Sequence, residues 1–428
     1  MRQKKFLFVS ADNLINDIAW QVLRQGHQIK FYNNLRKEKD CSDGFLPKTQ
    51  NWRKEINWAD VIIFDEVFGF GKEAQKLRRM GKRVIGGTPY TDRLEEDRAF
   101  GQEELKKYRI PILPYREFTD FSKAINYIKI HPGAYVFKPC GEVQNNKNLL
   151  YIGRMPDGSD TIEMLKSYRQ NFGSKIKLFQ LQKKVAGVEI GVGAFFNGRK
   201  FIYPININFE HKMLFPGEIG PATGEMGTSM FWSKPNRLFN NTLKKMEVKL
   251  AEEHYVGYID LNCIVNKNGI YPLEFTARFG FPTINIQSDG IIMPMGEFLF
   301  KLANGDNLRL KTRPGWQVGA RVVVPPYPYR QQDIFNAYAK GISINLKVNN
   351  LTGVHIEDIK IINGHWTPAG SSGTALVVVG MGKTLKAAQN QLYRRIKNIY
   401  IPNMFYRTDI GDRWYLEQEK LRRWGYLK

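Results

Sequence analysis

The order of short apolar runs in the first 90 residues constrains the fold of this chain most strongly. Helical segments such as Asn16–Gln25, which Gly26 closes, separate these runs. The strand-like runs are Phe6–Val9, Gln28–Phe31, Ala59–Phe64 and Arg83–Ile85. Strands that alternate with helices predict a parallel sheet covered by helices. We therefore expect a Rossmann-like domain over residues 1–95, with Ser10–Asn13 in place of a glycine-rich phosphate loop.

The rest of the chain predicts two further domains of mixed α+β type. Residues 96–315 carry helices and strands in mixed order, and about 112–185 read as a subdomain of their own. Residues 316–428 contain strand patterns at Ala320–Val324 and Ala375–Val379, followed by a helix at Leu385–Ile396. The predicted fold class is thus a multidomain α/β and α+β protein, with lengths typical of such domains.

Composition narrows the class of protein. The chain has 428 residues, is 43% hydrophobic, and has no apolar run long enough for a membrane helix, so we expect no membrane partner. Its three cysteines, Cys41, Cys140 and Cys263, form neither a metal-type pair nor a disulfide framework, which favours a cytoplasmic location. The net charge of +23 attracts polyanions such as phosphorylated metabolites. Because the basic residues are spread along the chain, nucleic-acid binding is not favoured, although it stays open.

Two residues suggest contacts with a nucleotide. Lys138 ends the strand-like run Tyr135–Lys138, where a lysine can reach a phosphate as a point charge. Glu189 begins the run Glu189–Phe195, whose glycines leave room above the strand, and its carboxylate can accept two ribose hydroxyls. The simpler alternatives are a lysine in a surface turn and a glutamate on an edge strand, where glycines only relieve packing.

Asp260 and Glu274 form a stronger pair. Each lies in a short apolar strand, and Asn266–Gly269 between them has the composition of a hairpin turn. A hairpin sets both carboxylates side by side on one face, and two acids buried together imply a cation. Mg²⁺ prefers such oxygen ligands. Arg278 follows closely and can hold a transferring phosphoryl group. The alternative is a structural salt bridge between one acid and Arg278.

The stretch from His211 to Gly227, HKMLFPGEIGPATGEMG, has a composition that neither a helix nor an ordinary strand favours. We expect an ordered loop that lines a substrate site.

Together these segments resemble the ATP-grasp ligases, and among them the phosphoribosylamine–glycine ligase family, also called glycinamide ribonucleotide synthetase. The loop resembles the family's DHKR…GPNTGGMG, and the segment LEFTARFGFP, from Leu273 to Pro282, resembles its EFNVRFGDPE. The helix-like stretch Arg98–Pro111 and the segment Tyr406–Gly411 resemble further family segments, so the similarity runs nearly end to end.

The resemblance implies a role for each matching residue. Arg278 and Lys212 would act in catalysis, while Lys138, Arg98, Lys147 and Glu189 would bind ATP. Asp260, Glu274 and Thr276 would hold Mg²⁺, with Mn²⁺ as an alternative. The expected substrate-binding residues are His211, Gly220, Pro221, Thr223, Gly224, Met226, Gly227 and Asp409.

The chain departs from the family at several of its substrate-gripping segments. Ser10–Asn16 replaces the glycine-rich loop that grips the ribose phosphate, and Ser371–Thr374 replaces a second glycine turn there. Around ATP, Asn145–Asn148 replaces the glycine-containing lid. Thr276 replaces a metal-binding asparagine, whereas Asp260 stands where many other ATP-grasp ligases have a metal-binding aspartate. Glu225 lies where the family has glycine.

The sequence therefore predicts an ATP-dependent carboxylate–amine ligase that forms an acyl phosphate, a reaction that depends on positioning and electrostatics. The resemblance implies glycine as the acid and phosphoribosylamine as the amine, and hence a part in purine biosynthesis. Two alternatives stay open: a ligase with a different amine, such as a modified nucleotide or base, and an inactive relative that binds nucleotide or nucleic acid. The oligomeric state is left open.

Overall fold

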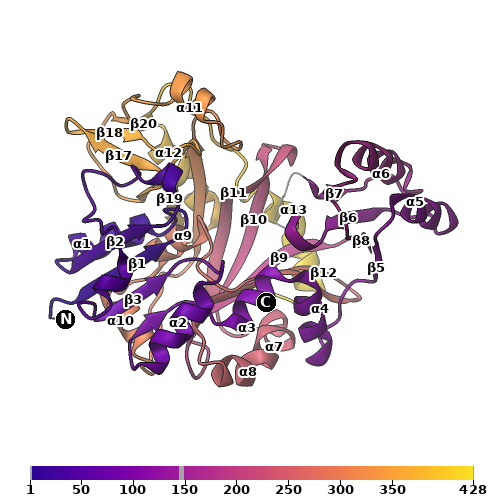
Figure 1. Cartoon of the computed structure of the whole chain (residues 1–428), viewed down its shortest axis with the longest axis horizontal. Coiled ribbons are helices and arrows are strands. Elements are labelled where there is room, and N and C mark those ends of the chain that lie inside the picture. The colour runs from indigo at the N-terminus through magenta and orange to yellow at the C-terminus, as the bar shows by residue number, and fades with distance from the viewer. Residues whose placement is uncertain (1, 144–148, 428) are drawn as a thin grey trace.

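The computed structural model describes residues 2–143 and 149–427 of the chain. Three main sheets organise it, together with two short two-stranded ribbons. The N-terminal sheet lies at one end in Figure 1, the central sheet crosses the middle, and the third sheet projects at the other end. No helix in the described part of the chain has the length and apolar character needed to cross a membrane.

The N-terminal sheet is parallel, in the order β2-β1-β3-β4, as predicted. Its strands are β1 (Lys5–Ser10), β2 (Gln28–Asn33), β3 (Val61–Phe64) and β4 (Val84–Ile85). Its helices are α1 (Asn16–Arg24), α2 (Phe70–Arg79) and α3 (Pro89–Glu96), with short 3-10 turns at Arg36–Glu38 and Trp52–Glu55. Phe6, Phe8 and Ile63 are fully buried, because a parallel sheet is covered on both faces.

The central sheet has eight strands in the order β13-β12-β9-β10-β11-β14-β19-β16, all of them antiparallel. They are β9 (Val188–Asn197), β10 (Ile205–Phe215), β11 (Ile219–Ser233), β12 (Val256–Asn266), β13 (Gly269–Thr276), β14 (Trp316–Val323), β16 (Val354–Ile356) and β19 (Thr374–Gly382). The sheet crosses the predicted domain boundary at residue 316 without a break, because β14 pairs with β11 and β19.

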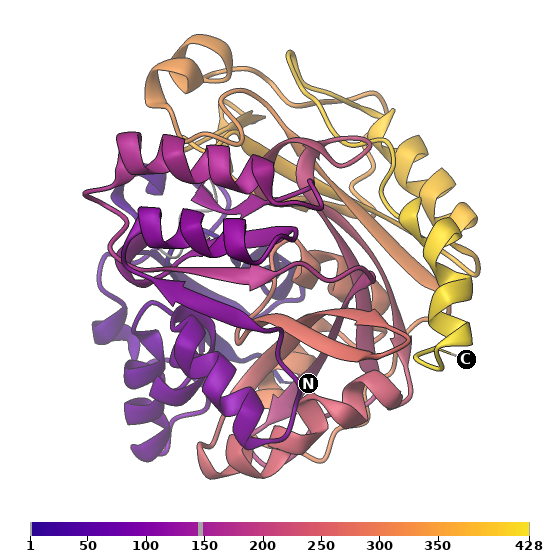
Figure 2. The ribbon, with the colours of Figure 1, turned by 90° about the vertical axis from the view of Figure 1, so that its right-hand side faces the viewer.

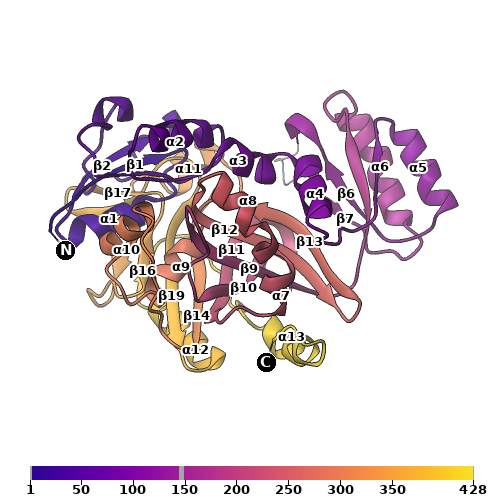
Figure 3. The same ribbon diagram turned by 90° about the horizontal axis from the view of Figure 1, so that it is seen from below.

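Helices surround this sheet (Figure 3). They are α4 (Arg98–Lys107), α7 (Arg237–Asn241), α8 (Glu247–Glu252), α9 (Thr283–Gly290), α10 (Met295–Ala303), α11 (Gln332–Tyr338), α12 (Leu385–Ile396) and α13 (Arg413–Arg423). The ribbons pair β15 (Asn345–Leu346) with β20 (Ile399–Tyr400), and β17 (Ile359–Ile362) with β18 (His365–Pro368). The predicted helix at 385–396 is confirmed.

The third sheet forms a small unit with its own core. Its order is β5-β8-β6-β7, from β5 (Tyr115–Phe118), β6 (Tyr135–Pro139), β7 (Tyr151–Ile152) and β8 (Phe179–Lys183). Helices α5 (Phe121–Ile130) and α6 (Ser159–Phe172) lie side by side over it (Figure 2). Phe137, Phe179 and Leu181 are buried between helices and sheet, in a hydrophobic cluster separate from that of the central sheet. We call this unit, from β5 to β8, the lid-like unit; it carries Lys138, near the end of β6.

Candidate active site

Polar side chains occupy one face of the central sheet at every second position. On β10 they are Asn206, Asn208, Glu210 and Lys212, whereas Ile205, Ile207 and Phe209 point into the core on the other face. The strand register places further polar residues on the same face. They are Glu189 on β9, Asp260 and Asn262 on β12, and Glu274 and Thr276 on β13. These strands therefore assemble the predicted nucleotide and metal residues on one surface.

Lys212 lies at the centre of this surface. Its Nζ is 2.8 Å from Glu274 Oε1, 3.2 Å from Glu189 Oε1 and 3.3 Å from Glu210 Oε2. Burial lowers the pKa of the ammonium, but the three carboxylates outweigh it and hold that pKa well above its ordinary value. Lys212 is therefore a permanent positive charge in a ring of acids.

Asp260 is buried beside this ring. Its Oδ2 accepts hydrogen bonds from Asn208 Nδ2 at 2.8 Å and from the Tyr258 hydroxyl at 3.0 Å. Burial raises the pKa of Asp260 to about 7, and the neighbouring Glu210 carboxylate raises it further. The hairpin turn at 266–269 is confirmed, but its register sets Asp260 opposite Thr276 and Glu274 opposite Asn262. The two acids therefore share a face as diagonal neighbours and are not directly opposite each other.

The glycines of β9 do not leave free space. A Cβ atom on Gly191 would lie 2.1 Å from Asn208 Oδ1, and one on Gly193 would lie 2.0 Å from the Tyr258 hydroxyl. The room expected above this strand is thus taken by side chains that hold Asp260 in place. Glu189 accepts a hydrogen bond from Asn262 Nδ2 at 2.8 Å. Burial raises the pKa of Glu189, but the Lys212 and Arg413 charges outweigh it and lower that pKa.

Two further cations reach this surface from outside the sheet. Lys138 comes from the lid-like unit, and Arg98 begins helix α4. Burial lowers the pKa of Lys138 to about 7, and the nearby Arg98 charge lowers it further, while Glu274 opposes both effects. Lys138, Arg98 and Lys212 thus gather beside Glu274, as a polyphosphate site requires. Lys147 lies outside the described residues.

The donor set suits a hard cation such as Mg²⁺. Asp260 and Glu274 offer carboxylate oxygens and Thr276 a hydroxyl, all on one face. Asn208 adds a buried amide oxygen, Oδ1, that has no hydrogen-bond partner among the described residues. The Lys212 ammonium already lies 2.8 Å from Glu274 Oε1, so there is room for a positive charge beside this carboxylate.

The glycine-rich segment is ordered but is not a loop. Residues 205–215 and 219–233 pair as the hairpin β10–β11, which corrects the prediction from composition. The register shifts near Met213, and Gly220 has a φ of 85°, a conformation that suits glycine. Bulges and glycine let an atypical composition form a strand.

The predicted substrate-binding residues of this hairpin have distinct surroundings. Thr223 Oγ1 donates to the Lys212 carbonyl at 2.7 Å, and Met226 is buried with Leu214 and Val323. A Cβ on Gly227 would lie 2.4 Å from the Gly319 carbonyl oxygen, so only glycine fits there, whereas Gly224 faces open space. Pro221, next to Gly220, is half-buried. Glu225 is buried, and its carboxylate contacts the Thr228 hydroxyl.

His211 and Asp409 belong to a clamp that holds this hairpin against the C-terminal segment. The fully buried Arg407 binds Asp409 at 2.7 Å, Glu218 at 2.7 Å and the Met213 carbonyl at 2.9 Å. Asp409 also accepts from the Gly217 backbone at 3.0 Å. His211 Nε2 accepts from the Gly411 N–H at 2.9 Å, so its proton resides on Nδ1, which faces Glu218 at 2.9 Å. The side chain of His211 points away from the Lys212 face, because neighbouring residues of a strand alternate.

Arg278 is held between two acids. It lies 2.7 Å from Glu66, which follows β3, and 3.1 Å from Glu95 on α3. These carboxylates outweigh the effect of burial and raise the pKa of Arg278 above its ordinary value. Arg278 therefore links the N-terminal domain to the end of β13, next to the predicted metal ligands Glu274 and Thr276.

Sequence reasoning missed Glu210, Asn208, Asn262 and Arg407. A signal for the first two was present, since the run from Ile205 to Lys212, ININFEHK, alternates apolar and polar residues. Asn262 follows the same alternation along β12, two residues after Asp260. Arg407 lies within the matched segment Tyr406–Gly411, but nothing local marks its contacts, because its partner Glu218 lies 189 positions away.

Comparison with known proteins agrees with this geometry. Residues 96–284 match the family model described as phosphoribosylglycinamide synthetase, ATP-grasp (A) domain, and residues 322–413 match the C domain of the same synthetase. The phosphoribosylamine–glycine ligase of Streptococcus pyogenes serotype M1 is 26% identical over 379 residues, which cover 84% of each chain. That of Listeria monocytogenes is 25% identical, covering 84% of this chain and 86% of its own.

Solved structures show the same architecture. The phosphoribosylamine–glycine ligase from Thermotoga maritima matches with a TM-score of 0.70 and 22% identity, over 95% of this chain and all of its own. A biotin carboxylase from Campylobacter jejuni matches with a TM-score of 0.63 and 12% identity, over 98% of this chain and 96% of its own. With both domain models matched in order, the predicted fold class is confirmed, and the chain belongs to the phosphoribosylglycinamide synthetase family of ATP-grasp ligases, enzymes that form C–N bonds.

Proposed function

We propose that this ligase joins a small, glycine-like carboxylate to an amine through an acyl phosphate, with ATP and Mg²⁺ bound on the polar face of the central sheet. The observation that carries the proposal is the meeting of Lys138, Arg98 and Lys212 with Glu274, next to Asp260. Cations there match the phosphates of a nucleotide, and the acids match a divalent ion. Mn²⁺ is an alternative ion.

The reaction balances without a covalent enzyme intermediate. A carboxylate oxygen of the substrate bonds to the γ-phosphorus of ATP while the bond from that phosphorus to the β–γ bridging oxygen breaks, which releases ADP. The amine nitrogen then attacks the acyl carbon, the acyl–oxygen bond breaks, phosphate leaves and the nitrogen loses a proton. Bound Mg²⁺ neutralises negative charge on the phosphates.

The side chains of the polar face supply position and charge for these steps. Lys138 and Arg98 lie where they can hold the nucleotide phosphates, and Lys212 can follow the charge that develops on the transferred group. Asp260, Glu274 and Thr276 would hold the ion, and Glu189 the ribose hydroxyls. The hairpin β10–β11, which carries Lys212, would line the substrate site.

The substrates of the relatives suggest a place in metabolism. The name of the matched ligases gives phosphoribosylamine and glycine. We propose a cytoplasmic ligase that takes glycine as its acid, and a part in purine biosynthesis if the amine is phosphoribosylamine. A different amine is the second candidate, favoured by Asp65, whose carboxylate accepts hydrogen bonds from the Ser10 hydroxyl and the Ala11 N–H at the end of β1.

Trapping of the acyl phosphate tests this proposal. Hydroxylamine attacks an acyl phosphate to give a hydroxamate, so the assay needs no knowledge of the natural amine. The purified chain with ATP, Mg²⁺, glycine and hydroxylamine should form glycine hydroxamate and ADP in equal amounts. ATP binding without hydroxamate from glycine or any other small amino acid would contradict the proposal and support an inactive relative.

A further inference from the structure

The carboxyl edge of the N-terminal sheet is the place where a second substrate would enter. In open α/β sheets ligands bind outside the carboxyl ends of the strands, where the strand order reverses. In the order β2-β1-β3-β4 this point lies between β1 and β3, and the turns there begin at Ser10 and Asp65. Arg278 contacts Glu66 at 2.7 Å and follows β13 by two positions. The edge therefore adjoins the proposed reaction site.

The β1–α1 turn at this edge is the position where an anion is expected to bind, because backbone N–H groups converge ahead of a helix. Here a side chain of the protein itself, Asp65, already occupies this anion seat. Asp65 Oδ1 accepts from the Ala11 N–H at 3.0 Å, and Asp65 Oδ2 accepts from the Ser10 hydroxyl. The Ser10 oxygen in turn accepts from the Leu14 N–H at 3.0 Å. Asp65 is fully buried, so a carboxylate of the chain lies where a phosphate would need to bind.

The guanidinium groups around the edge are also engaged with acids. Arg278 lies between Glu66 and Glu95, and Arg321 binds Glu357 with contacts of 2.7 to 3.0 Å.

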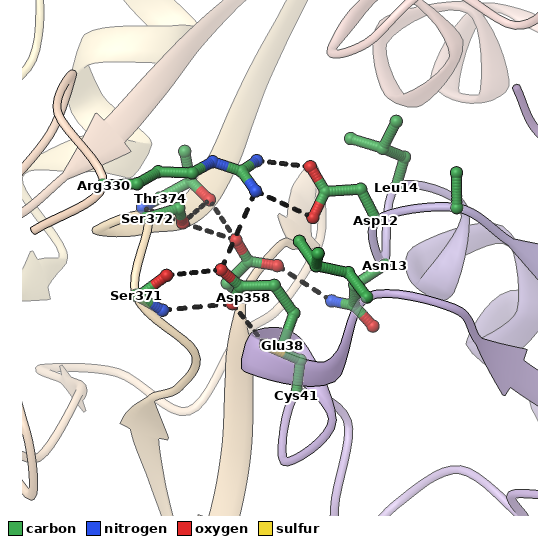
Figure 4. A network of polar contacts seen from close by, with 12 residues as sticks. Asp12, Asn13, Leu14, Glu38, Cys41, Arg330, Asp358, Ser371, Ser372 and Thr374 are labelled. Atoms are coloured by element: carbon green, nitrogen blue, oxygen red, sulfur yellow. Dashed lines mark hydrogen bonds and ion pairs between the residues drawn. The ribbon is translucent and has the colours of Figure 1, made fainter. Parts of the chain in front are cut away.

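Arg330 reaches across to the turn and binds both carboxylate oxygens of Asp12 (Figure 4). Around it lie the buried acids Glu38 and Asp358, the latter held by Asn13 at 2.9 Å and Ser372 at 2.5 Å. Arg278, Arg321 and Arg330 thus each already have a carboxylate partner, so a phosphate at this edge would meet excess negative charge.

From these contacts, and resting on the proposed ligase function, we propose that Asp65 is a specificity-determining residue that excludes phosphate from the β1–α1 turn, so that the acceptor amine carries no phosphate group there. The exclusion operates in either protonation state. Burial raises the pKa of Asp65 to about 7. Above that pH the carboxylate repels an anion, and below it the acid still occupies the donors of the turn.

Binding of ribose 5-phosphate, compared with ribose, tests the assignment. Calorimetry at pH 8 on the full chain uses four proteins: wild type, Asp65→Ala, Asp65→Asn and Asp92→Asn. Asp65→Ala frees the Ala11 N–H and the Ser10 hydroxyl, whereas Asp65→Asn removes the charge but keeps the seat filled. Asp92 is a matched control in the same domain: it is buried, accepts from the Gly71 N–H at 2.9 Å, and has a pKa raised to about 7 by burial.

We expect wild type and Asp92→Asn to bind ribose 5-phosphate no more tightly than ribose. Asp65→Ala should bind ribose 5-phosphate about tenfold or more tightly than wild type, since charge-assisted hydrogen bonds to a phosphate become available. Asp65→Asn should gain less than Asp65→Ala.

Two results would overturn the assignment: wild type that prefers ribose 5-phosphate to ribose by about tenfold, or Asp65→Ala that folds and gains no affinity. If Asp65→Ala does not fold, Asp65→Ser decides, because a serine is too short to reach both the Ala11 N–H and the Ser10 hydroxyl, and a folded Asp65→Ser variant without any gain in affinity also rejects the assignment. Hydroxamate formation does not involve the acceptor, so its failure counts against the ligase function and not against this specificity.

Discussion

Replacement of Arg407 by methionine should destabilise the fold and impair the ligase together. The guanidinium is fully buried and binds Glu218, Asp409 and the Met213 carbonyl, and methionine keeps its approximate length without these bonds. Loss of one partner of a buried ion pair costs about 3–5 kcal/mol. Glu218 and Asp409 are 35% and 22% exposed, so solvent screens part of this, and we expect a loss of about 2–3 kcal/mol.

Urea unfolding at pH 7 measures this loss, and Arg330→Met is the matched control. Arg330 also forms two bonds to an aspartate, but its side chain is 47% exposed, so its loss should cost about 1 kcal/mol or less. Burial raises the pKa of Glu218, but His211 and Arg407 outweigh it and lower that pKa to about 2. The stabilisation that Glu218 gains from these partners is complete above pH 4.5 and is lost as the pH falls through about 2. The difference in unfolding free energy between wild type and Arg407→Met should therefore narrow between pH 4.5 and pH 2.

Hydroxamate formation by Arg407→Met should fall by about tenfold or more, because the clamp positions the hairpin that carries Lys212. Equal losses of stability in the two arginine variants, or full activity in Arg407→Met, would refute the reasoning.

Three further results are expected. Asp260→Asn should lower glycine-dependent ADP release by about a hundredfold or more without loss of folding, whereas Asp92→Asn should leave the rate near wild type. Burial lowers the pKa of His355, but Asp17 and Asp289 outweigh it and raise that pKa to about 10, so its stabilisation is complete below pH 6.5 and is lost as pH rises through 10. Unfolding free energy should fall by about 2–4 kcal/mol over this range in wild type and far less in His355→Gln, as urea titrations at each pH would show. Removal of divalent ions with a chelator should stop ADP release, and excess Mg²⁺ or Mn²⁺ should restore it; activity that persists in chelator would contradict the metal assignment.

The sequence predicted the parts of the fold that depend on local pattern. The parallel N-terminal sheet, the hairpin turn at 266–269 and the helix Leu385–Ile396 follow from hydrophobic periodicity and turn residues, and the structure confirms them. The β10–β11 hairpin escaped prediction because glycines and bulges let strand pairing override composition. Its polar face was equally readable in principle, since Asn208, Glu210 and Lys212 alternate with core residues.

Contacts between distant segments were out of reach. The Arg407 clamp joins residues 194 positions apart, and Asp65 fills a turn that lies 54 positions earlier in the chain. The departure at Ser10–Asn13 was visible in the sequence, but only the structure shows which side chain takes up the donors of that turn. The reaction class was therefore predictable from motifs, whereas the exclusion of a phosphate depends on tertiary contacts.

The most direct test of the account follows an oxygen atom through the reaction. Glycine labelled with ¹⁸O in its carboxylate, incubated with the enzyme, ATP, Mg²⁺ and hydroxylamine, should pass one labelled oxygen to each phosphate released, because the carboxylate attacks the γ-phosphorus. Phosphorus NMR resolves labelled from unlabelled phosphate. Equal amounts of labelled phosphate and hydroxamate would support a ligase that acts through an acyl phosphate, and hydroxamate formed with unlabelled phosphate would contradict it.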